Sequence, residues 1–127
     1  MTRNLNPNLP LTLRTGANGA DRAGQIRHLN DAFRTSFVGG AVMVTVGIDS
    51  LTPELKVRVL KKVRDFSDFD ADNDPHREHD FGAFELSNKR FFFKIEYYDR
   101  SMEAGSPDPA DPAQTTRVLT VMLAEEY

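Results

Sequence analysis

The chain has 127 residues, of which 39% are hydrophobic and 28% are charged. These proportions are typical of an ordinary soluble domain, and they exclude collagen-like and wholly disordered chains. No apolar run approaches the roughly 18 residues that a membrane-spanning helix requires. The chain contains no cysteine, which excludes a disulfide framework and is typical of a reducing compartment. We therefore expect one soluble domain located in the cytoplasm.

Residues 1–20 are rich in Asn, Pro and Gly and show little apolar periodicity. They predict a flexible N-terminal tail ahead of a single α+β domain at residues 21–127. The first helix is expected to begin at Asp21, a suitable N-cap, and to be stopped by Gly39-Gly40. Its apolar stripe has spacings of three and four residues and consists of Ile26, Leu29, Phe33 and Phe37.

Residues 41–46 form a short, valine-rich apolar run, which predicts a strand that is buried on both faces. The second helix has a clearer beginning, because Thr52 can cap it and Pro53 fits the first helical position. One face of this helix is apolar and the remainder carries lysine and arginine, so we expect a basic amphipathic helix.

A β-hairpin is expected where aromatic and polar residues alternate after residue 80. A two-residue turn at Asn88-Lys89 would place Leu86 opposite Phe91. In that register one face of the hairpin is apolar. The other face then brings together four polar side chains: His79, Lys94, Glu96 and Tyr98.

The last element begins with a helix signal. Asp111 can cap, Pro112 fits the first helical position and Gln114 can reach back to the cap. The threonines and valines that follow favour a strand, but the cap favours a third helix. The expected fold is therefore α+β, with a small antiparallel sheet (the hairpin plus one further strand) packed with three helices in the order α-β-α-β-β-α.

The net charge of −3 hides a strong division along the chain. Residues 65–80 contain seven acidic side chains and one arginine, and residues 99–127 contain six acidic and two basic ones. A general nucleic-acid binder needs a concentrated basic surface instead. We expect these acidic segments to bind a basic surface on a protein partner. The alternative is that they only keep the domain soluble. The candidate partner-binding residues are Asp68, Asp70, Asp72, Asp74, Glu78 and Asp80.

Two chemical alternatives centre on histidine. His76 and His79, flanked by carboxylates, could ligate a divalent metal. His79 beside Glu96 could act as a general base. Asp70 opens a calcium-loop pattern, but that pattern then fails at the positions that require Gly and Glu. The chain carries no phosphate loop and no dinucleotide fingerprint, and we expect no cofactor.

Several segments are specific enough to indicate a family. They are Leu29-Asn30-Asp31-Ala32-Phe33-Arg34, Asp72-Asn73-Asp74-Pro75, Glu78-His79-Asp80-Phe81-Gly82-Ala83-Phe84, Phe92-Phe93-Lys94-Ile95-Glu96-Tyr97-Tyr98-Asp99, Ser106–Pro112 and Val118–Tyr127. From Ile26 onward the chain resembles a bacterial family described as domain of unknown function 3768. The resemblance brings no established activity, cofactor or catalytic residue. It implies an alphaproteobacterial, plasmid- or phage-borne setting, in which small acidic proteins often inhibit host defence.

Two functions from different classes follow. The first is a non-enzymatic acidic binding protein from a mobile element, which inhibits a nucleic-acid-handling host protein such as a CRISPR effector. Its partner would be a protein with a basic surface, and neither nucleic acid nor a membrane would be bound directly. The alternative is a small metal-dependent or acid–base enzyme centred on His79 and Glu96. The missing catalytic motifs favour the binding protein.

Overall fold

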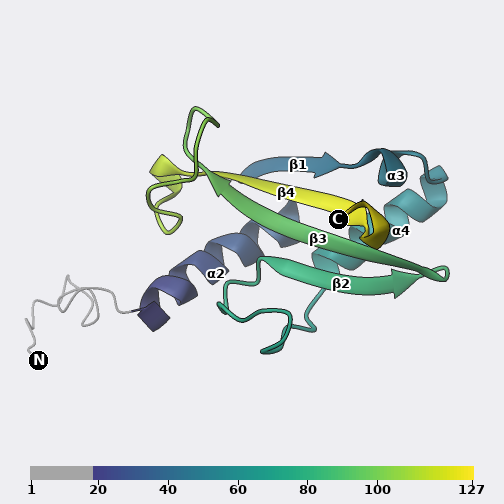
Figure 1. Cartoon of the computed structure of the whole chain (residues 1–127), viewed down its shortest axis with the longest axis horizontal. Helices are drawn as coiled ribbons and strands as arrows, with labels where there is room; N and C mark the ends of the chain where they lie inside the picture. The colour runs from purple at the N-terminus through teal and green to yellow at the C-terminus, as the bar shows by residue number, and fades with distance from the viewer. Residues whose placement is uncertain (1–18) are drawn as a thin grey trace, which may run out of the picture.

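The computed structural model describes residues 19–127, so residues 1–18 of the expected tail lie outside the described residues. The remaining two residues of that segment belong to the first helix (Figure 1). The helices are α2 (Gly19–Ser36), α3 (Val46–Asp49) and α4 (Pro53–Asp65). The strands are β1 (Gly40–Val44), β2 (Phe81–Leu86), β3 (Lys89–Tyr98) and β4 (Thr116–Leu123). No helix within residues 19–127 is long and apolar enough to cross a membrane.

The four strands form one mixed sheet in the order β1-β4-β3-β2. The two pairs β2/β3 and β3/β4 are antiparallel, whereas β1 lies parallel to β4. The α+β class is therefore confirmed, but the expected sheet of three antiparallel strands is wrong. The sheet is larger because the last element is a strand and lies between β1 and β3 (Figure 1).

The local helix signal at Asp111 is real, but it extends for only one turn. The Asp111 carboxylate accepts a hydrogen bond from the Ala113 N–H (2.9 Å) and another from the Gln114 side chain (2.8 Å). This cap supports a single 3-10 turn, Pro112–Gln114. From Thr116 the β-branched residues extend into β4, because the sheet offers backbone partners on both sides of that strand.

The hairpin turns at Ser87-Asn88, one residue earlier than expected. Both turn residues have positive φ (53° and 63°), as the tight turns that match the strand twist require. Leu86 therefore lies opposite Lys89, and Phe84 lies opposite Phe91. The expected register was wrong by two positions along β3. Because side chains alternate with a period of two, this shift leaves every residue within β2 and β3 on its expected face.

The helices α2 and α4 cover one face of the sheet, and Figure 1 looks onto the other face. The buried core lies between the helices and the sheet and includes Phe33, Ile48, Val59, Val63, Phe91, Phe93, Ile95, Leu119 and Val121. On the open face the Phe81, Phe92 and Tyr127 rings pack together, with centroids 5.1–6.1 Å apart. This cluster helps to cover the sheet face that lies opposite α2 and α4.

The ends of the helices test the cap predictions. Thr52 caps α4 as expected, since its hydroxyl accepts the Leu55 N–H at 3.2 Å. By contrast, α2 ends at Ser36, and Phe37 adopts the left-handed conformation there (φ 60°) ahead of the two glycines. The strand β1 is also less buried than expected, because it lies at the sheet edge and its Met43 side chain is 54% exposed.

Gly82 is required by a close approach between neighbouring strands. It lies opposite Phe93 in the β2/β3 ladder, and a Cβ atom added at Gly82 would come within 2.3 Å of the Phe93 ring. The Phe66 ring approaches the same point at 2.9 Å. The missing side chain therefore lets two core aromatic rings lie directly over the backbone of β2.

Replacing Gly82 with alanine should destabilise the protein by about 1–3 kcal/mol, because the Phe93 ring cannot move out of a packed core without strain. Urea denaturation measures the loss. Gly105→Ala is the matched control, since a Cβ atom at Gly105 meets nothing closer than 3.9 Å. Equal stability of the two variants would contradict this account of the core.

Candidate functional site

The acidic loop, residues 66–80, connects α4 to β2 and contains all six predicted partner-binding residues. The structure separates these six side chains into two groups. The exposed ones are Asp68, Asp70 and Asp72. Asp74 is only 5% exposed, and Glu78 and Asp80 are half-buried. The predicted patch is therefore smaller than six residues, because half of its members lie against the protein.

The exposed part of the loop is held by its own side chains. The Asp70 carboxylate accepts the backbone N–H groups of Asp72 (2.9 Å) and Asn73 (3.0 Å). The Asn73 side chain donates to the Asp68 carbonyl oxygen at 2.8 Å and accepts the Asp70 N–H at 3.0 Å. Asp70 is therefore both exposed and structural, whereas no side-chain hydrogen bond or ion pair of Asp68 or Asp72 occurs within the described residues.

Asp74 fixes the second half of the loop. Its carboxylate accepts the N–H groups of Glu78 and His79, both at 3.0 Å. Between these contacts the backbone turns sharply, and Arg77 and His79 have positive φ (60° and 56°). A non-glycine residue in that region is strained. The buried Asp74 carboxylate offsets the strain by satisfying two backbone donors.

His79 joins the loop to α2. Its Nδ1 lies 2.8 Å from an Asp31 carboxylate oxygen, and its ring stacks on Phe69 with centroids 3.8 Å apart. The Nε2 atom lies 3.7 Å from Asp74. A second link comes from Arg27, which donates to the Arg77 carbonyl oxygen at 2.9 Å. These contacts border a cavity of about 630 Å³ between the loop and α2.

Asn30, which is fully buried on α2, is the centre of a hydrogen-bond network. Its Oδ1 accepts from Arg117 Nε of β4 at 2.7 Å. Its Nδ2 donates to the Tyr97 hydroxyl of β3 at 2.8 Å and to the Glu78 carbonyl oxygen at 2.9 Å. The Tyr97 hydroxyl in turn donates to Glu78 Oε1 at 2.7 Å. One amide therefore connects the helix, two strands and the acidic loop.

Burial shifts the acidity of several members of this region. It raises the pKa of the Tyr97 hydroxyl, and the hydrogen bond to Glu78 raises that pKa further. Burial lowers the pKa of the Arg117 guanidinium. It also raises the pKa of the Asp80 carboxyl, with a smaller contribution from the neighbouring Glu78. The acidic loop thus holds one carboxylate whose charge is unfavourable in the folded state.

The expected catalytic pair does not form. His79 lies before β2 and faces α2, on the side of the sheet that the helices cover. Glu96 lies on the open face, where its carboxylate is 3.5 Å from Lys94 Nζ and accepts from the Tyr98 hydroxyl. The prediction that His79 and Glu96 share a face was wrong, because the chain leaves the strand geometry before Phe81.

The alternative metal site is not assembled either. His76 is exposed, whereas the ring of His79 is held by Asp31 and Phe69. Within the part of the chain that the structure describes, no group of three or more His, Asp or Glu side chains is arranged to hold a metal ion.

Asn30 and Asp31 place the loop, and the sequence patterns did not predict this role for either residue. A signal for Asn30 was present, because it follows Ile26 by four residues and precedes Phe33 by three, and therefore shares their stripe. A polar residue inside an apolar stripe requires buried partners. Asp31 lies beside that stripe, and no pattern in the sequence marks its contact with His79.

Replacing Asn30 with alanine should cost about 3 kcal/mol of stability, because Arg117 and the Glu78 carbonyl oxygen both lose a buried partner. Chemical denaturation measures this cost. His28→Ala on the exposed side of α2 is the control and should change stability by no more than about 0.5 kcal/mol. Indistinguishable midpoints would show that the network does not hold α2 in place.

Asp80→Asn should stabilise the protein at neutral pH. The folded state raises the pKa of Asp80, so it binds the proton more tightly than the unfolded state does. The ionised carboxyl is therefore unfavourable once the pH exceeds the folded-state pKa. The advantage of the variant should vanish below about pH 3.9, the ordinary pKa of aspartate. Melting temperatures of both proteins between pH 3 and pH 7, in roughly unit steps, measure this; a constant difference would contradict it.

Residues 44–126 match the family model described as "Protein of unknown function (DUF3768)". The matched region contains α4, the acidic loop and the strands β2, β3 and β4, while α2 with Asn30 precedes it. The chain matches no curated protein and no solved structure. Because the match covers more than half of the chain, the protein belongs to the DUF3768 family.

Proposed function

We propose that this protein is a non-enzymatic binding protein whose acidic loop occupies a basic, nucleic-acid-handling surface of another protein and thereby inhibits it. The observation that carries the proposal is the exposure of three carboxylates, Asp68, Asp70 and Asp72, within five residues of a loop whose backbone is fixed. Nucleic-acid-binding surfaces concentrate Lys and Arg to contact phosphates. A row of carboxylates can take the place of phosphates on such a surface.

Preorganisation of the loop supports this function. Binding by a mobile loop loses affinity to the ordering of that loop, and a loop that is already ordered avoids this cost. Here Asp70 and Asn73 fix the exposed tip, and Asp74 fixes the segment behind it. The contact of His79 with Asp31 then attaches the loop to α2.

Charge balance around the tip also supports it. No cation forms an ion pair with Asp68, Asp70 or Asp72 within residues 19–127. Their negative charges therefore remain uncompensated by direct contacts and can steer a basic partner toward the loop.

The test is capture of partners from a bacterial lysate with the immobilised protein and with the double variant Asp68→Lys/Asp72→Lys. The side chains of Asp68 and Asp72 carry charge but form no hydrogen bond within the described residues, so the variant should fold normally. Reversal of Asp70 or Asp74 would instead remove hydrogen bonds to backbone N–H groups. The native protein should retain a nucleic-acid-binding protein that the variant loses. Added nucleic acid should release that protein, and so should high salt.

The control is Glu54→Lys/Glu125→Lys, which changes the net charge equally at two exposed sites outside the loop. It should retain the same protein as the native chain. Capture that is equal for all three chains, or that nucleic acid does not release, would refute the proposed function.

A further inference from the structure

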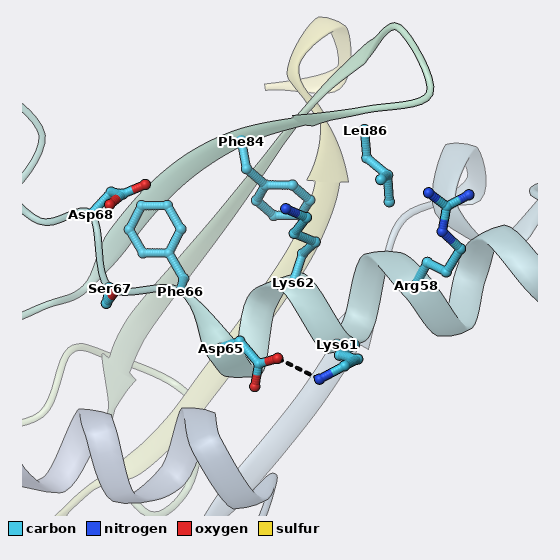
Figure 2. A pocket seen from close by; sticks show the side chains of 9 residues that line it. All are labelled: Arg58, Lys61, Lys62, Asp65, Phe66, Ser67, Asp68, Phe84 and Leu86. Carbon is cyan, nitrogen blue, oxygen red and sulfur yellow. Dashed lines mark hydrogen bonds and ion pairs between the residues drawn. The ribbon is translucent and has the colours of Figure 1, made fainter.

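A groove of about 560 Å³ lies between α4 and β2 (Figure 2). Its apolar floor is formed by Phe66, Phe84 and Leu86. Its rim on the α4 side carries Arg58, Lys61 and Lys62. Since side chains two apart along a strand share a face, Phe84 and Leu86 both project to the helix side of the sheet. The groove thus presents apolar surface next to cations.

The strand that borders this groove lies at the edge of the sheet. Within the described residues β2 pairs with β3 alone, so its second backbone edge has no strand partner. Such an edge can pair with an extended segment of another chain. When a peptide adds as a strand to such an edge, backbone hydrogen bonds supply affinity, and pockets for alternate side chains supply specificity.

The cations of the rim determine which extended segment of another chain can bind in the groove. Lys61 is already held by Asp65, with Nζ and Oδ2 2.6 Å apart. Arg58 and Lys62 form no hydrogen bond or ion pair within residues 19–127, and Figure 2 shows Lys62 extending toward Phe84. Asp68 lies at the opposite end of the groove from Arg58 (Figure 2). Carboxylates of a bound ligand are therefore favoured at the Arg58 end of the groove and disfavoured at the Asp68 end.

The other cations of α4 do not contribute to this rim. Lys56 pairs with Asp49 at 3.2 Å, and the Arg64 guanidinium lies over the Phe37 ring at 5.3 Å. Two unpaired cations therefore remain where the helix faces the edge strand. Their compact placement over apolar surface complements a ligand that is apolar at one end and acidic at the other.

We propose that this groove binds an extended peptide segment of a partner protein as an additional strand on β2. Apolar side chains of the peptide lie over Phe66 and Phe84, and its carboxylates contact Arg58 and Lys62. Asp68 borders both this groove and the acidic tip. The peptide proposal does not rest on the proposed function, because none of the contacts assigned to the peptide uses the Asp68 carboxylate.

The test uses a fluorescent peptide in which every second residue is serine and the intervening residues are two leucines followed by two glutamates. All leucines and glutamates then lie on one face of a strand. Fluorescence anisotropy should show saturable binding to the native protein. Arg58→Glu/Lys62→Glu should weaken binding about tenfold or more. A peptide with lysine in place of glutamate should bind the native protein no more tightly than the glutamate peptide binds this variant.

Two controls make the outcome decisive. Lys89→Glu/Arg100→Glu changes the net charge equally at exposed sites outside the groove and should bind the peptide normally. A peptide N-methylated along one backbone edge and a peptide N-methylated along the other edge should differ in their affinity for the native protein. The reason is that only one edge of an added strand faces β2. Equal affinity of the two methylated peptides, or of the two charge variants, would overturn the proposal. So would dimerisation of the free protein that excludes the peptide, since it would assign the groove to a second copy.

Discussion

The position of α2 depends on one buried side-chain amide. Asn30 has no exposure to solvent, and its three hydrogen bonds reach Arg117, Tyr97 and the Glu78 carbonyl oxygen. A buried polar network of this kind is favourable only when each member is satisfied. A small displacement of the helix would leave the Nε–H of Arg117 without its acceptor, although the same guanidinium also donates to the Pro109 carbonyl oxygen. The network therefore specifies where the helix lies in a way that apolar packing around Phe33 does not.

The two proposed surfaces are neighbours along the chain and meet at Asp68, which borders the groove and belongs to the acidic tip. The helix α4 supplies the cations of the groove, and the acidic loop that follows it supplies the exposed carboxylates. Asp65 and Lys61, which form an ion pair, mark the change of sign between them. A charge division that is visible along the sequence thus becomes a division in space, since helix and loop are both held against one sheet.

The parts of the fold that depend on local signals could be predicted from the sequence. Thr52 and Pro53 placed the beginning of α4, and the period of two placed Phe91 and Phe93 in the core although the turn itself was misplaced. Long-range contacts could not be predicted in this way. The cap at Asp111 indicated a helix, but the competing strand at Thr116 depends on β1 and β3, which are distant in sequence. The contact of His79 with Asp31 spans 48 residues and has no periodic signature.

The central place of β4 has a consequence for how the chain folds. The strands β1, β2 and β3 precede β4, yet β1 and β3 join one sheet only through it. During synthesis the β2/β3 hairpin is therefore complete while β1 and the free edge of β3 still lack the strand that pairs with both of them. Contacts between β1 and β4 close a loop of more than seventy residues, and such pairings form slowly. A nascent chain that pauses before Thr116 exposes unpaired strand edges and is prone to aggregate.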